Sequence, residues 1–218
     1  AAPITNIVFS QVDSRVLPAS NPAAYASQLI TERFPGQEGN PIEIIIPGGA
    51  AKLEEIKNYT TGISKVKGIV RIGEPQVLGN DVRVIAIHDM GPRTPLAEVL
   101  IKEIREIPAP DQTLVGGVAA DYADTQIGIA RTMPWALTWI AVGVLVLLFL
   151  FTGSIILPIK AVILNILSLA ATLGVITWIF VDGHLKWLVG DFTVTGAVDT
   201  GSIILVAVVA FGLSMDYE

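Results

Sequence analysis

The stretch Ser202-Ile-Ile-Leu-Val-Ala-Val-Val-Ala-Phe-Gly-Leu-Ser-Met-Asp216-Tyr217-Glu218 decides the fold class of this chain. Residues 203–215 carry no charge, and three small residues recur among them at helical spacing, namely Ala207, Ala210 and Ser214. An α-helix rises about 1.5 Å per residue, so this run covers roughly 20 Å, whereas a bilayer core needs about 30 Å. The stretch therefore predicts a membrane helix that is unfinished where the sequence stops.

Asp216 is a candidate functional residue in such a helix, because it places a charge in an apolar segment. If the helix continues, this carboxylate lies near the middle of the membrane, where it costs at least ~2.5–3.5 kcal/mol on insertion scales. Residues of this kind face the interior of a helix bundle, where they pair or titrate. Asp216 and its neighbour Tyr217 are therefore candidates for a proton or ion relay. The alternative is an aspartate at headgroup level beside an interfacial tyrosine.

Charge is distributed unevenly along the 218 residues, of which 52% are hydrophobic. Residues 1–132 hold 12 Lys/Arg and 15 Asp/Glu, whereas residues 133–218 hold two Lys/Arg and five Asp/Glu. This asymmetry predicts a water-facing domain at 1–132 and a membrane part at 133–218. The net charge of −6 argues against nucleic-acid binding, and the absence of cysteine excludes disulfides and thiolate metal sites.

Within residues 1–132, strand and helix patterns alternate in the order β-α-β-β-α-β. The strands are predicted at 42–46, 69–72, 82–87 and 114–118, and the helices at 51–65 and 94–107. This order indicates an α+β fold of the ferredoxin-like type, with both helices on one face of an antiparallel sheet. The core-facing helix residues are predicted to be Leu53, Ile56 and Ile63 in the first helix and Leu96, Val99, Leu100 and Ile104 in the second.

A further helix is predicted before this unit, from about residue 22 to 34. Ser20 or Asn21 can cap it, and Pro22 suits its first position. A helical pattern at 119–131 leads into the membrane part.

Two long apolar runs in the membrane part, at about 133–151 and 155–181, predict transmembrane helices. The truncated run at 202–218 is the third. Residues 152–154 form a tight connection, and residues 182–201 form a polar link with a possible interfacial helix at 184–189. The folded domain and the link are therefore predicted on one side of the membrane, but the charges do not decide which side.

Two other features are better explained without a ligand. Residues 46–52 (Ile-Pro-Gly-Gly-Ala-Ala-Lys) join a strand to a helix, where a phosphate cradle would sit, but they lack the Gly-Lys-Ser/Thr order of a P-loop. A plain turn is therefore predicted. His88 and His184 lie in different parts of the chain, so they are predicted to be solvated or interfacial and not metal ligands.

Four polar residues near or within the apolar runs also have ordinary explanations. Asp121 and Asp124 are predicted to face water, with pairing to Arg131 as the alternative. Lys160 is predicted to extend its side chain to the interface. Asn165 lies deeper and is predicted to bond to a neighbouring helix.

Several stretches resemble the MMPL (mycobacterial membrane protein large) branch of the resistance-nodulation-division (RND) transporters. They are Arg15-Val-Leu-Pro-Ala-Ser20, Leu157-Pro-Ile-Lys-Ala161, Trp178-Ile-Phe-Val-Asp-Gly-His184 and, most specifically, Phe211-Gly-Leu-Ser-Met-Asp-Tyr-Glu218. The resemblance covers essentially the whole chain. It implies a C-terminal-half fragment of a multi-pass protein of the bacterial inner membrane. Residues 1–132 would be its second extracytoplasmic porter domain, and the three helices would be the eighth to tenth of twelve.

The resemblance also implies the roles of the site residues. Asp216 and Tyr217 match one of two Asp-Tyr pairs in the family's proton relay, and the other pair belongs to the missing N-terminal half. Gly212, Leu213 and Ser214 would pack closely beside the relay. The implied function is export of lipidic or hydrophobic cell-envelope substrates, driven by the proton-motive force, without a cofactor and without enzymatic chemistry. The alternatives are a membrane-anchored scaffold that binds a lipid or protein, or another RND relative such as a sterol-sensing or protein-export component.

Overall fold

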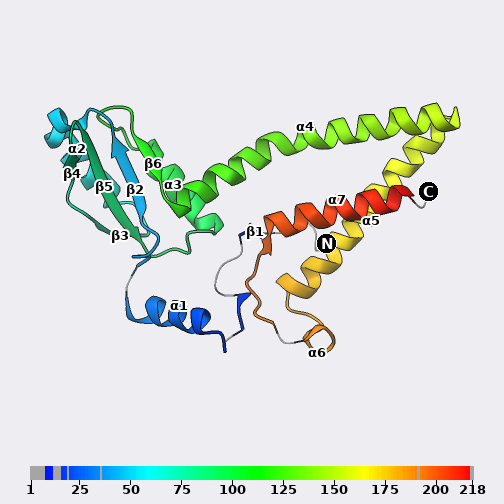
Figure 1. The fold of residues 1–218 in the computed structure, drawn as a ribbon, viewed down its shortest axis with the longest axis horizontal. Helices are drawn as coiled ribbons and strands as arrows, with labels where there is room; N and C mark the ends of the chain where they lie inside the picture. The colour runs from blue at the N-terminus through cyan, green and yellow to red at the C-terminus, as the bar shows by residue number, and fades with distance from the viewer. Residues whose placement is uncertain (1–7, 12–15, 19, 35, 191, 217–218) are drawn as a thin grey trace. The chain divides into compact units, whose positions relative to one another are not determined.

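The computed structural model describes residues 8–11, 16–18, 20–34, 36–190 and 192–216 (Figure 1). These residues form two compact units. The sheet unit lies within Val12–Gln126, and the helical unit combines the residues after Gln126 with a short strand near the N-terminus. The chain is thus a mixture of helix and sheet with long apolar helices, as the sequence predicted.

The sheet unit is built on one antiparallel sheet. Its strands are β2 (Ile42–Ile46), β3 (Ile69–Ile72), β4 (Gln76–Leu78), β5 (Asp81–His88) and β6 (Leu114–Gly116). The order is β3-β5-β2-β6, and β4 pairs with the start of β5 while β3 pairs with its end. The four predicted strands are confirmed within a few residues. β4 was not predicted, because its three residues are too few to show a periodicity.

One face of this sheet carries the core. Ile42, Ile44 and Ile46 are completely buried, whereas the residues between them are half-buried, as the period of a strand requires. Helices α2 (Leu53–Ile63) and α3 (Pro95–Glu106) cover this face, and the first residues of α4 join them. The helical core residues are Ile56, Tyr59 and Ile63 of α2, Ala97, Leu100, Ile101 and Ile104 of α3, and Ala119, Ala120 and Ala123 of α4.

The predicted inner faces of the two helices were partly wrong. Leu53, Leu96 and Val99 are 37%, 64% and 53% exposed. In α3 the buried face is centred about a quarter-turn away from the predicted stripe, because the helix packs through Ala97 and Ile101. Leu53 is the first residue of α2 and follows the 3₁₀ turn η3 (Gly49–Lys52), so it lies at the margin of the packed face.

Helix α1 (Pro22–Arg33) precedes the sheet. Its cap is Asn21, whose Oδ1 accepts a hydrogen bond from Ala23 N at 2.9 Å, and Pro22 occupies the first position as predicted. Tyr25 and Ile30 of this helix are exposed within the described structure, and Leu29 is half-buried.

The helical unit contains α4 (Val118–Thr152), α5 (Ile156–Ile176), the short α6 (Lys186–Val189) and α7 (Thr200–Asp216). α5 continues through a π-helical turn, η4 (Thr177–Val181). Two short parallel strands, β1 (Phe9–Ser10) and β7 (Val198–Asp199), pair beside the start of α7. α4 begins in the sheet unit and is continuous, so the predicted lead-in at 119–131 and the first apolar run form one helix.

Two of the described helices, α4 and α5 with η4, are long and apolar enough to cross a membrane. α4 holds Pro134 in its interior, and Pro134 has no N–H to donate to the carbonyl one turn earlier. Most of the large apolar side chains on its second half are exposed, including Trp139 and Phe151. Surface of this kind requires lipid or other helices around it.

Candidate functional site

Helix α7, which carries the predicted relay residue, has a firmly fixed beginning. Asp199 Oδ2 accepts hydrogen bonds from both N and Oγ of Ser202, each at 2.7 Å, and so caps the first turn. Thr200 Oγ1 donates to Ser10 O at 3.0 Å, and Val198 N donates to Val8 O at 2.9 Å. The start of α7 is therefore bonded to strand β1, near the other end of the chain.

The far end of α7 holds the predicted site. Asp216 is the last residue of the helix, and Tyr217 lies outside the described residues. The side chains of Ser214 and Asp216 are also outside what the structure describes. Leu213 is exposed, and a methyl group added at Gly212 would meet no other atom of the described chain within 4 Å. The turn before Asp216 thus has room for another helix to approach.

α7 contacts α5 along the helical unit. Three buried residues of α5 recur every three to four positions and share one face, namely Pro158, Ala161 and Asn165. Asn165 is buried, whereas Lys160 is exposed. A polar side chain buried in an apolar helix pair is consistent with a role in helix association.

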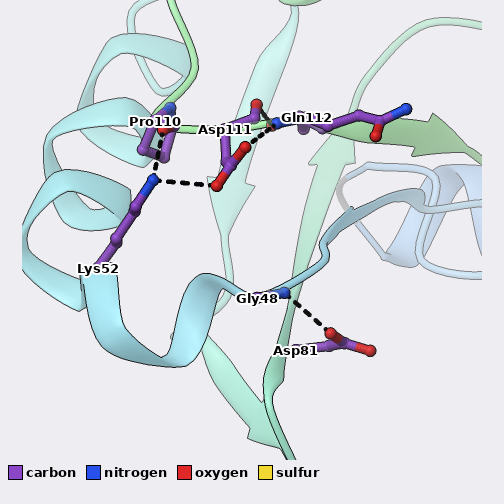
Figure 2. Close-up of polar contacts among 7 residues, drawn as sticks. Gly48, Lys52, Asp81, Pro110, Asp111 and Gln112 are labelled. Atoms are coloured by element: carbon purple, nitrogen blue, oxygen red, sulfur yellow. Dashed lines mark hydrogen bonds and ion pairs between the residues drawn. The ribbon is translucent and has the colours of Figure 1, made fainter.

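The strand-to-helix turn of the sheet unit is closed by the chain's own carboxylates (Figure 2). Gly48 N donates to Asp81 Oδ1 at 3.0 Å, and Lys52 Nζ donates to Asp111 Oδ2 at 3.0 Å and to Pro110 O at 3.2 Å. The hydrogen bond from Lys52 lowers the pKa of the Asp111 carboxyl below its ordinary value. A phosphate would have to displace these carboxylates, so the geometry favours a structural turn, as predicted.

Arg105 joins three elements of the sheet unit. Its guanidinium makes a two-pronged ion pair with Asp124 of α4, with Nη2 2.9 Å from Oδ2, and Nη2 also donates to Val115 O at 3.2 Å. Asp124 is exposed, as predicted, and its partner is Arg105 and not Arg131, which was the alternative. Arg105 and Asp124 lie 19 residues apart, and no local pattern signals such a pair.

The prediction that His88 is solvated or interfacial was also wrong, because the ring is completely buried. His88 Nε2 lies 3.1 Å from Asn40 O and donates to it, since a carbonyl can only accept. His184 is exposed, and its ring stacks on Trp178. Among the described residues, no group of three or more His, Asp or Glu could hold a metal ion.

Acidification is expected to destabilise the sheet unit through His88. Burial lowers the pKa of its imidazole below the ordinary value of 6.5. As the pH falls below about 6.5, His88 takes up a proton in the unfolded chain but stays neutral in the folded unit. The free energy of unfolding therefore falls by up to ~1.4 kcal/mol per pH unit. Hydrogen exchange of the β5 amides should therefore accelerate from pH 7 to pH 5, after correction for intrinsic rates.

The matched variants are His88→Gln and His184→Gln. The first should remove the pH-dependent part of the acceleration, and the second should leave it unchanged, because His184 is exposed. An unchanged pH dependence in His88→Gln would assign the effect to other groups.

The bond between Thr200 and Ser10 gives a second expected result. Thr200→Val keeps the shape of the side chain but removes the donor, so about 1 kcal/mol should be lost from the pairing of β1 with β7. The amides of Val198 and of the first turn of α7 should then exchange faster, roughly 5-fold at that free energy. Thr195→Val is the control, because Thr195 Oγ1 donates only locally, to Ala197 O. Equal exchange in both variants would contradict a role for Thr200 in holding α7.

No family model matches the chain. Among known proteins, a putative membrane protein of Streptomyces coelicolor is 31% identical over 235 residues, which is 100% of this chain and 30% of that protein. The trehalose monomycolate exporter MmpL3 of Mycobacterium tuberculosis is 31% identical over 238 residues, which is 99% of this chain and 24% of the exporter. The probable transport protein MmpL11 of Mycobacterium leprae is 30% identical over 161 residues, 71% of this chain and 16% of that protein.

The chain thus spans about a quarter to a third of the length of the first two relatives. The similarity to these two relatives covers the sheet unit and the apolar helices together. With this likeness along its whole length, and with two helices able to cross a bilayer, the chain is a membrane protein of the MMPL family.

Proposed function

We propose that the chain is part of a transporter that exports lipidic or hydrophobic cell-envelope substrates and is driven by the proton-motive force. The observation that carries this proposal is the similarity to MmpL3, named a trehalose monomycolate exporter, over 99% of the chain. MmpL11 of Mycobacterium leprae, a second relative, is named a probable transport protein. The rest of the transporter, about three quarters of the length of such an exporter, would supply the other helices.

In this proposal residues 1–132 form a ferredoxin-like porter domain outside the cytoplasm. The strand order β3-β5-β2-β6, the antiparallel pairing and the two helices on one face support the ferredoxin-like assignment. The helices at about 133–151, 155–181 and 202–218 cross the inner membrane, and the link at 182–201 lies on the same side as the porter domain. The protein is then multi-pass.

The proposed relay consists of Asp216 and Tyr217, which would meet a second Asp-Tyr pair in the remaining part of the transporter. Protonation of Asp216 removes a charge from an apolar environment, so it changes the free energy of packing α7 against a neighbouring helix. The open surface at Gly212 and Leu213, with Ser214 one residue further, is where such a helix would pack. Because α7 is bonded to β1 at its other end, a shift of the helix would also move strand β1.

A scaffold that binds a lipid or protein without transport is the competing function. The complete core of the sheet unit favours it, since such a domain could act as a binding module by itself. The two functions differ in their need for energy.

The test is export by the complete transporter in proteoliposomes that contain a labelled envelope lipid. Export should require an imposed pH gradient and should stop when a protonophore dissipates that gradient. Retained lipid binding with no gradient-dependent export would contradict the transporter proposal and favour the scaffold. Export that continues after dissipation would contradict proton driving while leaving transport intact.

A further inference from the structure

The short helix α6 presents large apolar side chains away from the described chain. Trp187 is 82% exposed and Leu188 is 64% exposed, and Val189 beside them is also exposed. Lys186 precedes them and is exposed as well. A tryptophan and a leucine side by side on a four-residue helix do not belong to a core, and they would be costly to leave in water.

This helix is held close to the end of the second membrane-capable helix. The His184 ring stacks on the Trp178 ring with centroids 4.6 Å apart, and His184 Nδ1 lies 2.9 Å from Trp178 O. Phe180 and Phe192 pack at 5.1 Å between centroids, and Lys186 Nζ lies 5.3 Å from the centroid of the Phe192 ring. These contacts fix the segment before α6 and the segment after it to the last turns of the α5–η4 helix.

The backbone conformation around α6 is that of a specific tight turn. Leu185 has φ +56°, the only positive φ of a non-glycine among the described residues. Gly183 has φ +76°, and a methyl group there would come within 2.9 Å of Val194 Cγ2. Gly183 therefore allows the close return of the chain onto itself, and Leu185 turns it into α6.

Chain length then limits the depth of Trp187. The 26 residues of α5 and η4 cover roughly 39 Å, more than the ~30 Å of a bilayer core, so Trp178 near their end falls close to the boundary. Trp187 is three residues from His184, which touches Trp178, so its Cα lies within roughly 10 Å of that of His184. The polar headgroup region on each side of the core is roughly 5–8 Å thick, so Trp187 stays near this boundary.

We propose that α6 is a membrane-interface anchor, with Trp187 and Leu188 inserted at the boundary between the headgroups and acyl chains of a lipid bilayer. Tryptophan favours this depth because its ring is apolar and its N–H needs a polar partner. Lys186 would face the lipid phosphates. The anchor would fix the depth of the end of α5 and of the link to α7. The proposal depends on membrane insertion and not on transport.

The chain has no cysteine, so single reporters can be placed without background. The protein is reconstituted into vesicles of phosphatidylcholine and phosphatidylglycerol with an environment-sensitive NBD label at Leu188→Cys. Asn58→Cys, on the exposed surface of α2, is the water reference, and Leu147→Cys, exposed in the apolar half of α4, is the bilayer reference. Quenching is measured with nitroxide lipids that carry the spin label near the headgroup or deep in the chain.

The label at position 188 should emit at a shorter wavelength than the label at 58, and the shallow nitroxide should quench it more than the deep one. Emission and quenching like those at 58 would overturn the anchor, and stronger quenching by the deep nitroxide, as at 147, would overturn the interfacial depth. Val189→Cys serves as a second reporter and should give the same order of quenching. Each labelled variant is compared with the unmodified protein by its elution volume on a sizing column. If one of the two reporters, at 188 or 189, elutes differently, the measurement is made with the other.

Discussion

Replacing Asp216 with Asn in the complete transporter is expected to reduce export by roughly 100-fold without lowering the amount of protein in the membrane. Asparagine has nearly the same shape as aspartate but cannot carry the proton. If protonation of this residue shifts α7 between two packings, its removal abolishes the coupling, and couplings of about 1–3 kcal/mol correspond to about 5- to 150-fold. The measurement is the initial rate of lipid export under a fixed pH gradient.

Two matched variants make the result specific. Asp182→Asn removes a carboxylate from the exposed link after η4 and should export normally. Asp216→Glu keeps the titratable group and should retain part of the activity. Normal export by Asp216→Asn at normal membrane levels would contradict the relay and leave the scaffold function as the better explanation.

The sequence could predict this candidate residue because a charge in an apolar helix is a local signal. A charged residue at the end of an apolar run is visible from its immediate neighbours in the sequence alone. Its geometry could not be predicted in the same way. The residues that would surround the carboxylate belong to other helices, and Tyr217 lies outside the described part of the chain.

In the fold, too, local features could be predicted from the sequence and contacts between distant residues could not. The isoleucine-rich run at 42–46 predicted strand β2 correctly, because a short apolar run rich in β-branched residues is typical of a strand wherever it lies in the sheet. The apolar runs likewise predicted α4 and α5. By contrast, the bond from Thr200 to Ser10 spans 190 residues, and the pairing of Arg105 with Asp124 joins α3 to α4 across 19 residues. Contacts of this kind depend on how the helices and strands pack together, and the periodicity of the sequence does not predict that packing.

Helix α3 shows how a helix can be predicted correctly while its buried face is predicted wrongly. The predicted stripe followed the large apolar residues and so included both Leu96 and Leu100. The helix packs instead through Ala97, Leu100, Ile101 and Ile104, which follow the i, i+3, i+4, i+7 pattern. Ala97 is small enough to bring the start of the helix close to the sheet, and this rotates Leu96 out of the core.

Leu100→Ala is therefore expected to destabilise the sheet unit strongly, and Leu96→Ala is not. Leu100 is 1% exposed inside the core, so truncation leaves a cavity beneath the sheet and should cost about 2–5 kcal/mol. Leu96 is 64% exposed on the same helix, one turn earlier, and its truncation should change the stability by less than about 0.5 kcal/mol. The two variants have identical chemistry and differ only in the face they occupy.

The measurement has to observe the sheet unit directly. All four tryptophans lie after residue 126, so intrinsic fluorescence reports on the helical unit and not on the sheet. Hydrogen exchange of the β2 and β5 amides is suitable, since these central strands should open only when the unit unfolds. At about 2–5 kcal/mol, Leu100→Ala should accelerate their exchange by roughly 30-fold or more. Equal acceleration in both variants would contradict the described face of α3 and restore the stripe that the sequence suggested.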